Sequence, residues 1–108
     1  MKREVLGDAY SLSLVFAGDA RTRGLNLRYR GKSYVPNVLA FPYDKTTGEI
    51  FINQKQAARE AASFDLTPKK FIALLFVHGM FHLKGMRHGS TMEREERRVL
   101  HMIDQKFS

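Results

Sequence analysis

The chain of 108 residues contains no cysteine. A disulfide framework, a thiolate nucleophile and a sulfur-ligated zinc site are therefore excluded, and folding needs no oxidising compartment. Tryptophan is also absent, and proline occurs only three times. No stretch reaches the ~18 to 20 apolar residues of a membrane span, and no signal-type apolar segment follows the first residues. These absences predict a cytoplasmic protein with no membrane anchor.

The composition is that of one small domain. Apolar residues make up 44% of the chain and aromatic residues 11%, which is enough for a real but modest core. The chain shows no internal repeat, low-complexity segment or linker. We therefore expect a single domain over residues 1–108.

Basic residues exceed acidic ones, 18 to 11, for a formal net charge of +7. Part of the excess is concentrated in one segment without an intervening acid, at Arg21, Arg23, Arg28, Arg30 and Lys32. A dense positive field attracts polyanions, and contacts with a phosphate backbone are its commonest use. The alternative is ordinary solubility charge.

Hydrophobic patterns predict three strands in one mixed sheet. The first follows the alternation over Tyr10–Phe16, the second is the apolar run Val38–Phe41 ended by Pro42, and the third is Glu49–Ile52. A turn over Asp44–Gly48 joins the last two.

The remaining segments predict helices. Asp19 is expected to cap a short helix over residues 20–27, with Asn26 near the surface and a loop over residues 29–34 after it. Asn53 caps a helix over residues 54–63, and Ser90 begins a last helix with a capping box.

The helix over Lys69–Lys84 is central to the expected fold. Thr67 and Pro68 are a strong start signal, and Gly85 ends the helix. Its apolar residues cover nearly every face, which is typical of an element buried in a core. The fold class is therefore α+β, with a small mixed sheet packed against helices and this helix at the centre.

Three of the four histidines fall within eleven residues, at His78, His82 and His88. The first two lie one turn apart on one helix face, and the third follows Gly85 and can fold back over them. This spacing predicts a metal site with three imidazole ligands and one open position. Such a site lowers the pKa of bound water to about 7, so hydrolysis is the first hypothesis. His101 has no partner at ligand spacing and is interpreted as structural.

The residue after the first histidine is Gly79. Metalloproteases of the H-E-x-x-H type have a glutamate general base at this position, so a protease of this type would lack its catalytic group here. A glycine inside a helix costs about 1 kcal/mol relative to alanine. We therefore expect that Gly79 is present for a steric reason. Either another backbone or a substrate approaches closely there, or the helix simply packs tightly at this position.

Two separated blocks of the sequence resemble a known family. The segment His78–His88 reads H-G-M-F-H-L-K-G-M-R-H and resembles the H-G-x-x-H-L-x-G-Y-D-H signature of the YbeY endoribonuclease family. The second block contains Leu25-Asn26, Tyr29-Arg30-Gly31-Lys32 and Asn37–Pro42, which are similar to the family's L-N-x-x-Y-R-G-K and D/N-V-L-S-F-P. Gly48-Glu49-Ile50 is similar to its G-D-I strand.

The resemblance implies a compact α+β endoribonuclease. It implies one divalent metal ion, expected to be zinc, held by His78, His82 and His88, although three imidazoles also accept nickel, copper or iron. It implies cleavage of single-stranded RNA, maturation of the 3′ end of small-subunit ribosomal RNA, and ribosome quality control. By position, Arg30 would be the catalytic cation facing the metal, and Arg28, Arg30 and Lys32 would bind RNA. Ribosomal RNA and small-subunit ribosomal proteins are the expected partners.

The chain also departs from the family pattern. Arg87 and Met86 replace the aspartate and tyrosine before the third histidine, and most of the helix that precedes the first strand is expected to be absent. A cation at Arg87 would weaken metal retention and favour phosphate. Two alternatives stay open, a non-catalytic RNA- or ribosome-binding module with a structural metal, and a metal hydrolase with another substrate.

Overall fold

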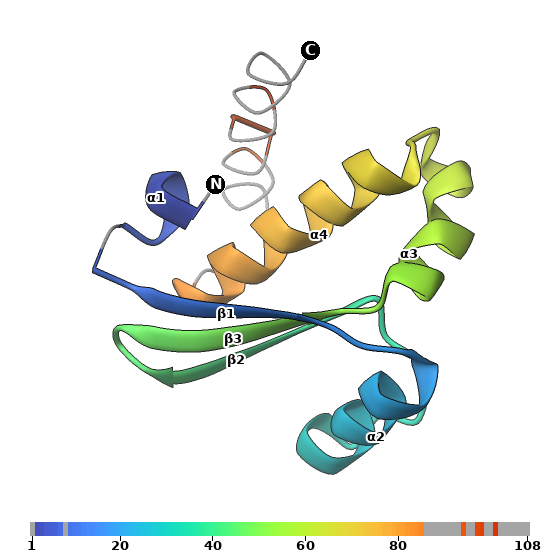
Figure 1. Cartoon of the computed structure of the whole chain (residues 1–108), viewed down its shortest axis with the longest axis horizontal. Coiled ribbons are helices and arrows are strands. Elements are labelled where there is room, and N and C mark those ends of the chain that lie inside the picture. Colours follow the sequence, from blue (N-terminus) through green and yellow to red (C-terminus); the bar gives the residue numbers. More distant parts are fainter. Residues whose placement is uncertain (1, 8, 86–93, 95–96, 99–100, 102–108) are drawn as a thin grey trace.

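The computed structural model describes residues 2–7, 9–85, 94, 97–98 and 101. The fold is α+β, as predicted (Figure 1). In chain order its elements are α1 (Lys2–Val5), β1 (Ser11–Phe16), α2 (Asp19–Arg30), β2 (Val38–Asp44), β3 (Thr47–Ile52), α3 (Gln54–Ala61), the 3-10 helix η1 (Ala62–Phe64) and α4 (Pro68–Leu83). None of the helices described is long and apolar enough to cross a lipid bilayer.

The three strands form one mixed sheet in the order β1-β3-β2, which confirms the prediction. β1 pairs with β3 in parallel, from Ser11 opposite Thr47 to Phe16 opposite Ile52. β2 pairs with β3 in antiparallel fashion, with an irregularity between Pro42 and Asp44. The prediction that Pro42 ends this strand is wrong, because an edge strand tolerates a proline that lacks an N–H donor.

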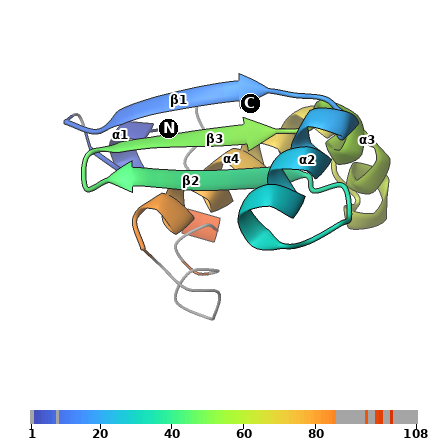
Figure 2. The ribbon, with the colours of Figure 1, turned by 90° about the horizontal axis from the view of Figure 1, so that it is seen from below.

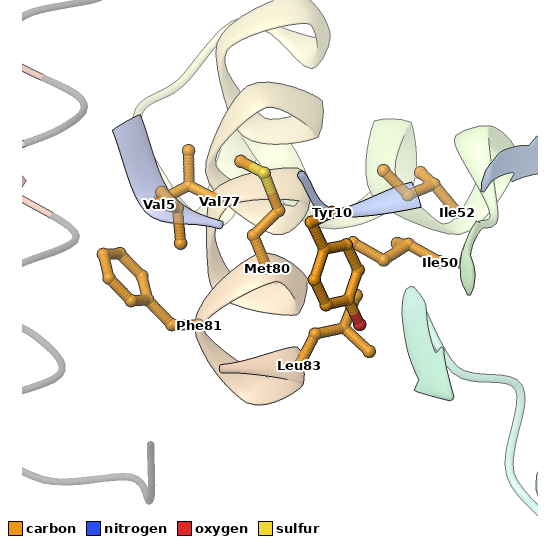
Figure 3. Packing of buried hydrophobic residues seen from close by; sticks show 8 residues of the cluster. All are labelled: Val5, Tyr10, Ile50, Ile52, Val77, Met80, Phe81 and Leu83. Carbon is orange, nitrogen blue, oxygen red and sulfur yellow. The ribbon is translucent and has the colours of Figure 1, made fainter. Parts of the chain in front are cut away.

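Helices cover the two faces of the sheet unequally. α4 and α1 lie on one face and α2 lies on the other, over one end of the strands (Figures 1 and 2). The main core forms between β3 and α4, where Ile50 and Ile52 pack with Val77 and Met80 (Figure 3). A second cluster joins α3 to α4 through small and large residues, Ala57, Ala61, Phe71 and Leu75. The predicted burial of α4 is therefore confirmed.

α2 differs from its prediction in three respects. It ends at Arg30 rather than Leu27, because Gly31 adopts a left-handed conformation (φ 67°), its amide donates to the carbonyl of Leu27, and the amide of Lys32 donates to that of Asn26. Its N-cap is Gly18, so Asp19 is the first helical residue and does not cap the helix. Asn26 is fully buried rather than near the surface, and its Nδ2 donates to the carbonyl of Tyr34 over 3.1 Å.

The other helices follow the sequence signals more closely. Asn53 caps α3 by accepting from the amide of Gln56, and Thr67 caps α4 by accepting from the amide of Lys70. The predicted helix over residues 54–63 continues instead as η1 after Ala61. The short helix α1 does precede β1. The predicted helix beginning at Ser90 lies mostly outside the described residues.

Gly48 on β3 occupies a site with no room for a side chain. A Cβ there would collide with the hydroxyl of the buried Tyr10 and lie 2.9 Å from a methyl group of Leu83 (Figure 3 shows Tyr10 beside Leu83). Gly48→Ala is expected to destabilise the protein by about 1–3 kcal/mol, the usual cost of overpacking. The shift of the urea unfolding midpoint measures it.

Gly24→Ala is the matched control for this substitution. Gly24 lies within α2, and a Cβ there meets nothing within 4 Å. Alanine is expected to stabilise this exposed helical position by about 0.5–1 kcal/mol. Equal or greater stability of Gly48→Ala would contradict the packing described around Tyr10.

Candidate metal centre and groove

α4 presents two histidines to the surface while the rest of its sequence builds the core. Val77, Met80 and Phe81 are buried, whereas His78 and His82 are half-buried. Their Nε2 atoms lie 3.1 Å apart, and the two rings meet edge-on at 71° with centroids 4.7 Å apart. The predicted convergence of these two side chains is therefore confirmed.

The spacing of the two nitrogens fits a metal ion. Two nitrogens that each lie about 2.0–2.1 Å from a tetrahedral zinc are about 3.3 Å apart, close to the 3.1 Å found here. The same distance also suits a hydrogen bond in which one ring donates to the other. Within the described ranges no group of three His, Asp or Glu side chains could hold an ion. His88, the predicted third ligand, lies outside the described residues.

The histidine pair faces a groove of about 870 Å³. α4 forms one wall, and the edge strand β2 with the loop before it forms the other. The lining residues are Arg30, Tyr34, Val35, Pro36, Asn37, Val38, Leu39, Ala40, Pro42, Gln56, Glu60, His78, Gly79 and His82. The groove thus brings Arg30 and the two histidines to one concave surface.

Gly79 lies between the two histidines and packs against the sheet. A Cβ at this position would lie 3.1–3.4 Å from the side chain of Ile50. The tight-packing interpretation of this glycine is thereby supported, because Ile50 would have to shift by a few tenths of an ångström to admit a Cβ here. Gly79 also lines the groove.

A polar cluster in the groove has no strong signal in the sequence. The Nδ2 atom of Asn37 donates to Glu60 Oε1 over 2.9 Å, and the Nε2 atom of Gln56 donates to Glu60 Oε2 over 2.7 Å. All three residues line the groove. Asn37 belongs to the second motif block, which was the available signal, but Gln56 and Glu60 read only as polar positions of a surface helix.

The basic segment does not converge on the groove as a whole. Arg30 lines it, whereas Arg28 and Lys32 are exposed and are not among the lining residues. The guanidinium of Arg28 lies over the ring of Tyr29, 5.3 Å from its centroid. Arg23 donates from Nε to the carbonyl of Ser33 over 2.8 Å and so holds the loop that follows α2.

A polar network fixes the start of α2 against α3. The buried Asn53 donates from Nδ2 to Asp19 Oδ1 over 2.8 Å and to Thr22 Oγ1 over 3.1 Å. Arg59 forms an ion pair with Asp19 at 2.8 Å. The hydrogen bond from Arg59, then that from Asn53, lowers the pKa of Asp19 from 3.8 to about 2.

This network predicts an acid-dependent part of the stability. Because the pKa of Asp19 is lowered on folding, its contribution is complete above about pH 4 and is lost as the pH falls towards about 2. Asp19→Asn is expected to flatten the dependence of the free energy of unfolding on pH in that window. Urea unfolding at several pH values measures the slope.

Arg59→Gln provides the comparison for this experiment. It keeps the carboxyl group of Asp19 but removes the main cause of its lowered pKa, so the slope is expected to fall partway. An unchanged slope in both variants would show that Asp19 has the same pKa in the folded and unfolded states.

Comparison with known proteins places this geometry in a family. The family model described as Endoribonuclease YbeY matches residues 1–107. The chain belongs to the YbeY endoribonuclease family. The resemblance of the two motif blocks is thus confirmed over nearly the whole chain.

Curated YbeY proteins match most of this chain. A protein named Endoribonuclease YbeY from Aromatoleum aromaticum is 40% identical over 97 residues, which are 87% of this chain and 62% of that protein. The YbeY protein of Finegoldia magna is 36% identical over 99 residues, or 85% and 65% of the two chains. The chain thus spans less than two thirds of the length of these relatives.

A solved structure shares the fold. The solution structure of TM1509 from Thermotoga maritima superposes with a TM-score of 0.70 at 22% identity, covering 98% of this chain and 75% of that one. The YbeY signature departures at Met86 and Arg87 lie outside the described residues, as does the turn predicted for His88.

Proposed function

We propose that this chain is a metal-dependent endoribonuclease that cleaves single-stranded RNA. Its proposed role is maturation of the 3′ end of small-subunit ribosomal RNA and ribosome quality control, with ribosomal RNA and small-subunit ribosomal proteins as partners. The observation that carries the proposal is the 3.1 Å approach of the His78 and His82 Nε2 atoms on the wall of a groove that Arg30 also lines. Membership in the YbeY endoribonuclease family supports the same activity.

His78, His82 and His88 are the proposed ligands of one zinc ion. The donor set fits, because zinc accepts imidazole nitrogens at the spacing that the first two rings already have. When bound, such an ion supplies a Lewis acid and a water that loses its proton near neutral pH. Both rings are half-buried on α4.

Arg30 is the proposed catalytic residue of the protein itself. A guanidinium can donate to two phosphate oxygens at once. Arg30 stands at the end of α2, where the Gly31 cap and the Asn26 hydrogen bond to Tyr34 fix the turn into the loop. Its position on the groove supports the proposal that Arg30 orients a phosphodiester and stabilises the charge that builds on it during cleavage.

The groove disfavours a protease. The position that supplies the glutamate base in H-E-x-x-H enzymes is Gly79, which packs on Ile50. The net charge of +7 also favours a polyanionic substrate over a peptide.

The decisive experiment maps cuts in ribosomal RNA. Zinc-loaded protein is incubated with deproteinised ribosomal RNA and, separately, with a perfect RNA duplex of equal length. We expect endonucleolytic cuts in single-stranded segments and none in the duplex. Tight RNA binding without any cut would favour the non-catalytic RNA-binding module.

A further inference from the structure

Three aromatic side chains lie on the face of the sheet opposite α4. Tyr29 comes from the last turn of α2, and Phe41 and Tyr43 come from β2. Phe41 contacts the ring of Phe51, which alternates along β3 with Ile50 and Ile52 of the α4 core. We call Tyr29, Phe41 and Tyr43 the aromatic ledge, and Figure 2 shows α2 over only one end of this face.

The side chains of the aromatic ledge contact one another and residues of β3. Tyr29 meets Phe41 edge-on with centroids 5.4 Å apart, and Phe41 meets the buried Phe51 at 5.7 Å. The hydroxyl of Tyr43 donates to Glu49 Oε1 over 2.6 Å. This hydrogen bond is the main cause of the raised pKa of Tyr43, to which nearby Tyr29 also contributes. The rings are therefore held in place by contacts with one another, with Phe51 and with Glu49.

Much of the two tyrosines nevertheless faces solvent. Tyr29 is 59% exposed and Tyr43 is 63% exposed, although both side chains are large and partly apolar. Arginines accompany them, since the Arg28 guanidinium lies 5.3 Å from the Tyr29 ring centroid and Arg21 lies 5.3 Å from that of Phe51. Exposed aromatic faces among cations are the features that bind single-stranded nucleic acid, because bases stack on rings while phosphates meet the charges.

The ledge is continuous with the groove. Tyr29 directly precedes Arg30, and Phe41 stands between Ala40 and Pro42, which line the groove. Ala40 lies opposite Ile50 of the α4 core, whereas Phe41 lies opposite Glu49, which accepts the hydrogen bond from Tyr43, so Phe41 and Tyr43 lie on the side of the sheet away from α4. β2 is an edge strand, so a polymer leaving the groove can pass around it onto the ledge.

We propose that the aromatic ledge is a second contact surface for single-stranded RNA, where bases flanking the segment in the groove stack on Tyr29 and Tyr43. The inference rests on the proposed function in taking RNA as the ligand. Glu49 is the one acidic group in contact with the ledge among the interactions described above, and its carboxylate can accept a hydrogen bond from a base amino group.

Binding of two oligonucleotides by the zinc-loaded full chain tests the proposal. The probes are fluorescein-labelled oligouridylates with 2′-O-methyl groups, one of about 4 and one of about 12 nucleotides, both within the usual range of site sizes. Fluorescence anisotropy at fixed low salt gives the Kd of each. Tyr29→Leu and Tyr43→Leu remove one ring each, Tyr43→Phe keeps the ring, and Phe64→Leu removes an equally exposed aromatic from η1, outside the groove lining.

Each leucine variant on the ledge is expected to weaken binding of the longer probe about tenfold, the loss of one base–aromatic stack. The shorter probe is expected to bind as before, and Tyr43→Phe and Phe64→Leu are expected to match wild type on both. Wild-type binding of the longer probe by both leucine variants of the ledge would contradict the proposed RNA contact at the ledge. Cuts in ribosomal RNA would still support the proposed function in that case. Failure of the wild-type chain to bind either probe would overturn both.

Discussion

His82→Ala is expected to abolish metal binding and RNA cleavage together. His82 supplies one of the two nitrogens whose 3.1 Å approach fits a shared ion, and alanine leaves only one of them. We expect the affinity for zinc to fall by more than about 100-fold, since loss of a mere outer-shell partner already costs up to that factor. Zinc titration by calorimetry and a cleavage assay on the same preparation measure the two losses.

His101→Ala is the matched control. His101 is exposed and was interpreted from the sequence as structural, so its removal is expected to change neither zinc affinity nor cleavage. Because His82 is half-buried on α4, thermal unfolding of the variant must first show a folded protein. A folded His82→Ala protein that lacks metal yet cuts RNA at the wild-type rate would remove the proposed mechanism.

Arg30→Ala is expected to retain metal and lose most turnover. Arg30 is exposed at the end of α2 and lines the groove, so its removal leaves the histidine pair and the core untouched. Loss of one group that stabilises developing charge lowers kcat by about 100- to 1000-fold. Single-turnover cleavage at saturating RNA separates this effect from weaker binding.

Two further variants sharpen the assignment of Arg30. Arg30→Lys keeps the charge but loses the two-pronged contact with phosphate, so it is expected to recover only part of the rate. Lys55→Ala removes an exposed cation from α3, outside the groove lining, and is expected to cleave normally. Undiminished turnover of Arg30→Ala would show that another cation stabilises the phosphate.

Much of the fold was predictable because its signals are local. Thr67 and Pro68 define the start of α4, and the alternation from Tyr10 to Phe16 contains β1. The predicted end of α2 at Leu27 is wrong, although Gly31 is a helix-ending glycine like Gly85. The predicted loop over Tyr29–Tyr34 is correspondingly wrong at its start, because Tyr29 and Arg30 belong to the last turn of α2.

Other features depend on contacts outside the helix or strand that carries the residue. Asn26 is polar and was assigned to the surface, yet it is buried because its amide holds the carbonyl of Tyr34. Pro42 is a strand-end signal in the sequence, but whether a strand tolerates a proline depends on its place in the sheet, and β2 lies at the edge. The two histidines of α4 were predictable from their spacing, whereas Glu60 and Gln56 enter the groove only through the packing of α3 on α4.

The lack of a side chain at Gly79 affects how closely α4 packs against β3 beside the cleft. His78 and His82 flank this residue on one helix, so any lift of α4 away from Ile50 carries both rings together and preserves their mutual distance. The distance between those rings and Arg30 would change with such a movement, because Arg30 comes from a different helix, α2. The packing of Gly79 on Ile50 therefore affects the distance from the histidines to Arg30. The distance between the two histidines is set by their spacing of four residues on one helix.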